Sequence, residues 1–164
     1  MNVKLEKAQH KFIESIGKLC DSFGLNKLVA QLYGLLYLSG RPLSLDEMAK
    51  MLGVSKGSVS LNIRELEKWG AVKNIWVKGS RKDYYEAELD IKKVAMNKIY
   101  SGVSKRMADV SSMLGEFKDI IKSAENELND EEKAIVEIYE KRLQKIEDLK
   151  DLAAKALSIA EKVL

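Results

Sequence analysis

The chain has 164 residues, of which 46% are apolar and 32% charged, a balance typical of about one folded domain and not of a disordered chain. Its single cysteine, Cys20, and single histidine, His10, exclude an intrachain disulfide, a Cys/His zinc site and a Ser-His or Cys-His catalytic pair within one chain. We therefore expect no enzyme, no metal and no cofactor. No signal peptide or membrane span is visible, so we expect a cytoplasmic protein without membrane contact.

Only 10 Gly and 1 Pro interrupt the chain, which predicts long helices. Apolar residues at three- and four-residue spacing predict a helix over residues 3–23, ended by Gly24. Asn26 is a good N-cap for a second helix that continues to Leu38. Apolar side chains occupy more than one face of this second helix, so it is expected to be the buried centre of a small bundle.

Two short helices follow. Ser44 and Glu47 form a capping-box pattern that opens a helix over residues 45–52, and Gly53 closes it. Another helix is predicted over about residues 56–69 after a turn of about three residues.

Three residues indicate how these two helices meet. Ala49 permits close approach, Gly53 permits a left-handed turn, and Val59 anchors the second helix. This spacing is typical of a helix-turn-helix.

A β-hairpin is predicted next. Residues 71–77 are β-branched and aromatic, residues 84–89 have the pattern of a second strand, and the loop 78–83 between them is polar and basic.

From Ile91 the sequence is helical to its end, interrupted only near Asn129, where Asp130 can cap the next helix. Apolar residues alternate steps of four and three in both predicted helices, which indicates a hairpin with arms of roughly 50 Å. The first series is Val103, Met107, Val110, Leu114, Phe117, Ile121, Ala124 and Leu128. The second series is Val136, Tyr139, Leu143, Ile146, Lys150, Ala153, Leu157, Ala160 and Leu164, with Lys150 its one polar member.

The last predicted helix carries a second apolar stripe, which one helix-helix seam does not use. Its members are Ile135, Ile138, Leu149, Leu152, Ala156, Ile159 and Val163. Such a stripe favours a homodimer.

Positive charge is concentrated in one part of the chain. Residues 50–82 hold eight basic and two acidic side chains, a net charge of +6, which leaves −3 for the other 131 residues. A solvated charged face is the simpler interpretation, but the helix-turn-helix pattern favours duplex DNA as the partner. The candidate DNA-binding residues are Ser55, Lys56, Gly57, Ser58, Ser60, Leu61 and Arg64 on the second short helix, and Lys73, Lys78, Gly79, Ser80, Arg81 and Lys82 on the hairpin.

Two neighbouring positions leave alternatives open. Leu61 can contact a thymine methyl or lie under a neighbouring helix. Asn62 lies near the inner face, where a structural hydrogen bond is favoured over base reading.

Residues 23–88 resemble the winged helix-turn-helix of MarR-type regulators, and the run SKGSVSLNIRELEKWG over residues 55–70 is most similar to the GbsR-like branch. The resemblance implies a sequence-specific, double-stranded-DNA-binding transcriptional regulator, with repression the expected mode, that acts as a homodimer on an inverted repeat. It places a recognition helix of about 55–69 in the major groove and a wing of about 78–83 on the minor groove or the backbone. The alternative is a winged-helix scaffold that binds protein and has no sequence-specific DNA binding.

The resemblance also divides the chain. Residues 1–24 and 91–164 are expected to dimerise, and residues 25–90 to form the DNA-binding domain. The Asp-x-Arg pattern common in MarR-type wings is absent, so a phosphate contact is the alternative to minor-groove insertion for Arg81.

MarR-type proteins often bind a small-molecule effector, and GbsR-like regulators are associated with choline, although the effector of this chain is unknown. A quaternary ammonium would need an aromatic cage. The available rings are Tyr33, Tyr37, Trp69, Trp76, Tyr84 and Tyr85. Their spacing favours core packing over a cage.

Overall fold

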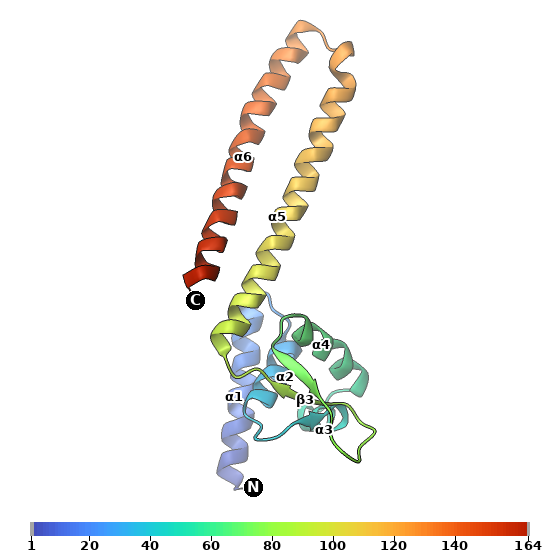
Figure 1. Ribbon diagram of the computed structural model, residues 1–164, viewed down its shortest axis with the longest axis vertical. Helices are drawn as coiled ribbons and strands as arrows, with labels where there is room; N and C mark the ends of the chain where they lie inside the picture. Colours follow the sequence, from blue (N-terminus) through green and yellow to red (C-terminus); the bar gives the residue numbers. More distant parts are fainter. Residues whose placement is uncertain (1, 164) are drawn as a thin grey trace. The chain divides into compact units, whose positions relative to one another are not determined.

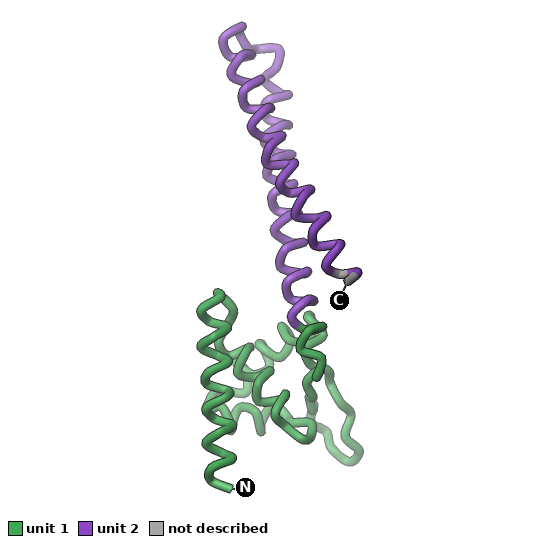
Figure 2. The backbone as a smooth tube through the Cα atoms, turned by 90° about the vertical axis from the view of Figure 1, so that its left-hand side faces the viewer, with its two compact units in different colours: residues 1–94 green, residues 95–164 purple. Residues whose placement is uncertain are grey.

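The elements of the computed structural model, which describes residues 2–163, are mainly helical (Figure 1). In chain order they are α1 (Val3–Ser22), α2 (Lys27–Tyr37), β1 (Leu43–Ser44), α3 (Leu45–Leu52), α4 (Lys56–Lys68), β2 (Val72–Ile75), β3 (Tyr84–Ala87), α5 (Ile91–Ala124), the 3-10 helix η1 (Glu125–Glu127) and α6 (Asp130–Val163). They form two compact units, residues 1–94 and residues 95–164 (Figure 2). The predicted fold class, mainly α with a small β-hairpin, is confirmed.

Local sequence signals determine where the helices of the first unit begin and end. The Asn26 side chain accepts hydrogen bonds from the backbone N–H groups of Leu28 and Val29, which caps α2 as predicted. Gly53 ends α3 in the left-handed region at φ 67°, where a side chain would be strained.

The core of the first unit surrounds α2. Leu32 and Leu35 have no exposed surface, and they share one buried cluster with Met48 of α3 and with Val59 and Ile63 of α4. The predicted central, buried position of this helix is therefore confirmed. Burial of so many apolar side chains is the main favourable term in the folding of this unit.

The sheet has three antiparallel strands in the order β1-β3-β2. The predicted hairpin pairs Val72 with Ala87 and Ile75 with Tyr84. The third strand, β1, was not predicted. It has two residues, too few for a period, and exists because Leu43 pairs with Tyr85, far along the chain.

Helix α1 packs closely on α2. A Cβ atom at Gly34 would lie 2.9 Å from the Cγ2 atom of Ile16, a separation that real contacts do not show. The missing side chain at Gly34 therefore permits this approach, and α1 belongs to the same compact unit as the sheet and α2–α4.

In the second unit, α5 and α6 run antiparallel along a shared seam (Figure 1). Most seam positions predicted from the spacing are half-buried, and Leu114 is buried. The rings of Phe117 and Tyr139 meet edge-to-face with centroids 5.9 Å apart. The polar seam member, Lys150, places its Nζ 3.4 Å from the Ser111 hydroxyl.

The connection between the two long helices differs from the prediction in one respect. Asn129, not Asp130, caps α6: its side chain accepts a hydrogen bond from the Glu132 N–H, and the Glu132 carboxylate accepts one from the Asn129 N–H. This reciprocal pair is the capping-box arrangement with Asn in the first position. The last position of the predicted seam, Leu164, and the side chain of Val163 lie outside the described residues.

Along residues 2–163, no helix combines the length and the apolar composition that crossing a membrane requires.

Candidate nucleic-acid interface

Helices α3 and α4, the turn at Gly53 and the β2–β3 hairpin form a winged helix-turn-helix. The buried side chains of Met48, Val59 and Ile63 join the two helices through one core. The Ser55 side chain accepts a hydrogen bond from the Ser58 N–H and so begins α4 as predicted. The helix-turn-helix expected from the spacing of Ala49, Gly53 and Val59 is therefore confirmed.

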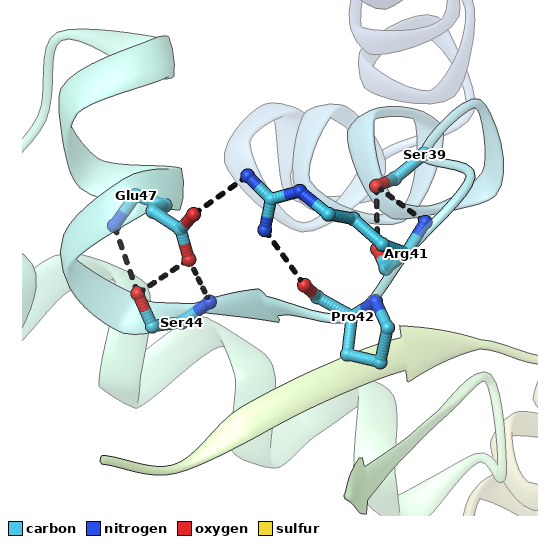
Figure 3. A network of polar contacts seen from close by, with 5 residues as sticks. All are labelled: Ser39, Arg41, Pro42, Ser44 and Glu47. Atoms are coloured by element: carbon cyan, nitrogen blue, oxygen red, sulfur yellow. Dashed lines mark hydrogen bonds and ion pairs between the residues drawn. The ribbon is translucent and has the colours of Figure 1, made fainter. Parts of the chain in front are cut away.

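A polar network holds the start of α3 (Figure 3). The Glu47 carboxylate accepts hydrogen bonds from the N–H and the hydroxyl of Ser44, both at 2.8 Å, and from the Arg41 guanidinium at 2.7 Å. The Glu47 N–H donates in return to the Ser44 hydroxyl. The predicted capping box is thus present, with Arg41 as an added partner that the sequence pattern did not indicate.

These contacts lower the pKa of Glu47 from its ordinary 4.5 to about 2, first through Arg41 and then through the backbone and side chain of Ser44. A carboxyl whose pKa is lower in the folded state stabilises the fold above its unfolded pKa, and this contribution is lost as pH falls from about 4.5 towards 2. Because the side chain is partly exposed, solvent screening reduces the contribution to about 1 kcal/mol.

Replacement of Glu47 with Gln is therefore expected to lower the free energy of unfolding by about 1 kcal/mol at pH 7 and by much less at pH 2. The measurement is urea unfolding at a series of pH values, with Glu67→Gln, an exposed acid of α4, as the control. A loss that stays the same at both pH values would contradict this electrostatic role.

The predicted DNA-binding residues of α4 divide by exposure. Ser55, Lys56, Gly57, Leu61 and Arg64 are exposed, whereas Ser58 and Ser60 are half-buried. Gly57, Leu61 and Arg64 follow each other at four and three residues, so they share one face of the helix. The hydroxyls of Ser55 and Ser58 lie 2.9 Å apart, because the Ser55 hydroxyl also accepts the Ser58 N–H in the amino-terminal cap.

The structure shows the surroundings of the two positions of α4 for which alternatives were open. Leu61 is 67% exposed, so the chain itself does not cover it with a neighbouring helix. The Asn62 amide donates to the Ser58 carbonyl oxygen at 2.7 Å, which is a structural hydrogen bond of the helix.

The wing carries the other predicted residues. Lys73, Lys78, Gly79, Arg81 and Lys82 are exposed, and Ser80 is half-buried. The Ser80 hydroxyl accepts a hydrogen bond from the Lys82 N–H, which shapes the loop tip. Lys73 pairs with Glu86 across the hairpin at 3.1 Å, so this lysine lies on the strands and its charge is partly neutralised.

Asp46, in the first turn of α3, joins α4 to the wing. One carboxylate oxygen lies 2.9 Å from Lys56 Nζ and the other 3.1 Å from Lys82 Nζ. The amino-terminal end of α4 and the wing therefore lie side by side. These contacts, first with Lys56 and then with Lys82, hold the pKa of Asp46 below its usual range, and Asp46 raises the pKa of Lys82.

Sequence reasoning missed Asp46 as a site residue. An acid in the first turn of a helix already has an explanation in the helix dipole, and no local pattern relates it to Lys82.

The core interpretation of the aromatic residues holds for most rings and is wrong for Trp76. Tyr33 and Tyr85 are buried, and Trp69 packs against the core. The Tyr33 hydroxyl donates to the Glu88 carbonyl oxygen at 2.8 Å, and burial raises the pKa of Tyr33 to about 12. Trp76, by contrast, is 79% exposed, because it follows the last paired residue of β2, where the sheet no longer covers it.

Within the described residues, no group of three or more His, Cys, Asp or Glu side chains is placed to hold a metal ion.

Comparison with known proteins shows which regulators the chain is similar to. No family model matches the chain. It is 34% identical over 93 residues to the HTH-type transcriptional repressor GbsR of Bacillus subtilis strain 168. The matched segment covers 57% of this chain and 51% of that protein. It is 31% identical over 86 residues to the HTH-type transcriptional repressor OpcR of the same organism, and the matched segment covers 52% of this chain and 46% of that protein. The chain thus spans about half the length of the curated relatives it matches.

Among solved structures, the fold is similar to the crystal structure of a transcriptional regulator, with a TM-score of 0.62 at 20% identity. The similarity covers 93% of this chain and 95% of that one, and it concerns the fold alone. With the relatives named above, the predicted resemblance of this chain to helix-turn-helix transcriptional regulators of the GbsR-like branch is confirmed.

Proposed function

We propose that the chain is a sequence-specific DNA-binding transcriptional regulator that acts as a homodimer and represses. The observation that carries the proposal is the exposed face of α4 formed by Gly57, Leu61 and Arg64, with the basic wing beside the start of that helix. The matched relatives GbsR and OpcR are named HTH-type transcriptional repressors, which supports the same function.

Helix α4 has the features of a recognition helix. Its amino-terminal end carries Lys56 and the positive end of the helix dipole, which suit a DNA phosphate. Along the exposed face, Gly57 lets the helix approach the duplex closely, Leu61 offers an apolar contact for a thymine methyl, and Arg64 can donate two hydrogen bonds to guanine. These features support a position of α4 in the major groove.

The wing supplies contacts to the backbone or the minor groove. Lys78, Arg81 and Lys82 are exposed around the loop tip, where Gly79 adopts φ 82°. Trp76 joins this group as an additional contact, because an exposed indole beside cations can pack on a sugar and donate its N–H to a phosphate.

A second copy is the proposed partner of α6. Leu149 and Leu152 are 66% and 64% exposed, and they belong to a stripe that the α5–α6 seam leaves uncovered. The other exposed large residues of this stripe are Ile135, Ile138 and Ile159. An apolar stripe of this length is typical of a protein interface, and a twofold dimer would present two copies of α4 to an inverted repeat.

The test selects bound sites from a random duplex library with the full chain. The expected motif is an inverted repeat with half-sites about 10 base pairs apart, bound by two chains, with affinity that falls steeply as salt rises. A single asymmetric half-site bound by one chain would overturn the dimer. Failure to retain any duplex at about 50 mM salt would overturn DNA binding and favour the protein-binding scaffold.

A further inference from the structure

Asp46 contacts the two lysines that lie where the proposed recognition helix meets the wing. Its two carboxylate oxygens each take a different lysine, Lys56 at 2.9 Å and Lys82 at 3.1 Å. The helix dipole of α3 favours an acid at position 46 whether or not lysines lie beside it. The capping box of Ser44 and Glu47 forms without Asp46, so neither feature explains the two lysine contacts.

We propose that Asp46 limits the affinity of this surface for the DNA backbone, because its carboxylate occupies the two lysines that phosphates would otherwise bind. The inference rests on the proposed function, which it deepens. A phosphate that approaches Lys56 or Lys82 must displace the carboxylate or remain close to its negative charge.

The contacts are of a kind that DNA can displace. The side chains of Lys56 and Lys82 are both 58% exposed, and that of Asp46 is 41% exposed. Ion pairs so open to water are weak and are screened by salt. The carboxylate stays charged at neutral pH, since both lysines lower the pKa of Asp46. It therefore competes with phosphate under all ordinary binding conditions.

The test compares Asp46→Asn with the parent chain in binding to a 30-base-pair duplex of arbitrary sequence, measured by fluorescence anisotropy across a salt series. At about 0.1 M salt the variant is expected to bind on the order of tenfold more tightly, with a salt slope steeper by about 1 to 2, because two lysines become available to phosphates. The gain should vanish near 1 M salt.

Asp83→Asn is the matched control. Asp83 is an exposed acid of the wing, next to Lys82 in the chain, and its carboxylate contacts the Asn74 amide at 3.5 Å. This substitution adds the same charge close to the same surface without releasing the Lys56 and Lys82 pairs. It is expected to tighten binding by about twofold, the effect of one charge acting through water.

A second comparison tests the mechanism. In a Lys56→Gln/Lys82→Gln chain, the effect of Asp46→Asn should fall to about that of the control. A gain that stays near tenfold there would overturn the proposal, since the carboxylate would then act without the lysines. Equal or weaker binding by Asp46→Asn in the parent chain would also overturn it and would make Asp46 an organiser of the wing.

The outcomes separate the inference from the proposed function. If the parent chain and every variant fail to bind duplex at low salt, the proposed function fails and the inference fails with it. If the parent chain binds the duplex but Asp46→Asn binds it no more tightly, the inference alone fails. Circular dichroism checks that Asp46→Asn is folded, and Asp46→Ser, another residue suited to a first helical turn, serves as the second variant.

Discussion

Replacement of Arg64 with Ala is expected to weaken binding to the selected operator by about 10- to 100-fold. Arg64 is exposed on the same face of α4 as Gly57 and Leu61, so its guanidinium can reach a base edge in the major groove. An arginine that donates two hydrogen bonds to one base contributes to selectivity as well as affinity. The loss should therefore be larger on the operator than on an arbitrary duplex at the same salt, measured by anisotropy.

Lys68→Ala is the matched control for this substitution. Lys68 is the last residue of α4, it is exposed, and its Nζ pairs with the Glu65 carboxylate at 2.6 Å. Both substitutions remove one positive charge from the same helix, but Lys68 lies one turn further from its amino-terminal end than Arg64 does, and the charge of Lys68 is already paired with Glu65. We expect less than about threefold weakening for Lys68→Ala. Equal effects of the two substitutions would contradict the major-groove assignment of Arg64.

Replacement of Leu32 with Ala is expected to lower the free energy of unfolding of the first unit by about 2 to 5 kcal/mol. Leu32 has no exposed surface and lies in the middle of α2, with the core of α3, α4 and the sheet around it. The cost combines the lost burial of the side chain with the cavity left behind, and it is a large part of the stability of an ordinary domain.

Urea unfolding followed by tryptophan fluorescence is the measurement, because Trp69 and Trp76 both belong to the first unit and report on it separately from the α5–α6 hairpin. Leu38→Ala is the control: Leu38 lies just after α2 and is 43% exposed, so its loss should cost less than about 1 kcal/mol. Similar losses for the two substitutions would show that α2 is not the centre of this core.

Much of the fold could be predicted because its signals are local. The caps at Asn26, Ser44 and Ser55 and the left-handed turn at Gly53 each depend on residues within one turn of helix. The apolar spacing likewise predicted which side chains face the core or the seam. Such patterns are legible in a sequence because helix geometry relates each residue to its near neighbours.

The candidate interface was predicted less completely. The exposed positions of Lys56 and Arg64 follow from the helical period, whereas the sequence left the exposure of Leu61 open. The exposure of Trp76 does not, because tryptophan beside β-branched residues is more often part of a core, and only the end of strand pairing at Ile75 leaves it uncovered.

The sequence by itself determined the order and type of the main elements, the helix-turn-helix and the concentration of positive charge in residues 50–82. Only the tertiary structure decided that β1 pairs with β3, that Arg41 joins the capping box, and that one carboxylate, Asp46, holds both Lys56 and Lys82. The physical reason is that the partners in each contact belong to different elements or loops and are not joined by the geometry of one helix. Such contacts depend on how the elements and loops pack, and no helical period or strand alternation predicts them. The concentration of basic residues therefore indicated duplex DNA as the expected partner. The ion pairs that these residues form decide how much of their positive charge stays available for binding.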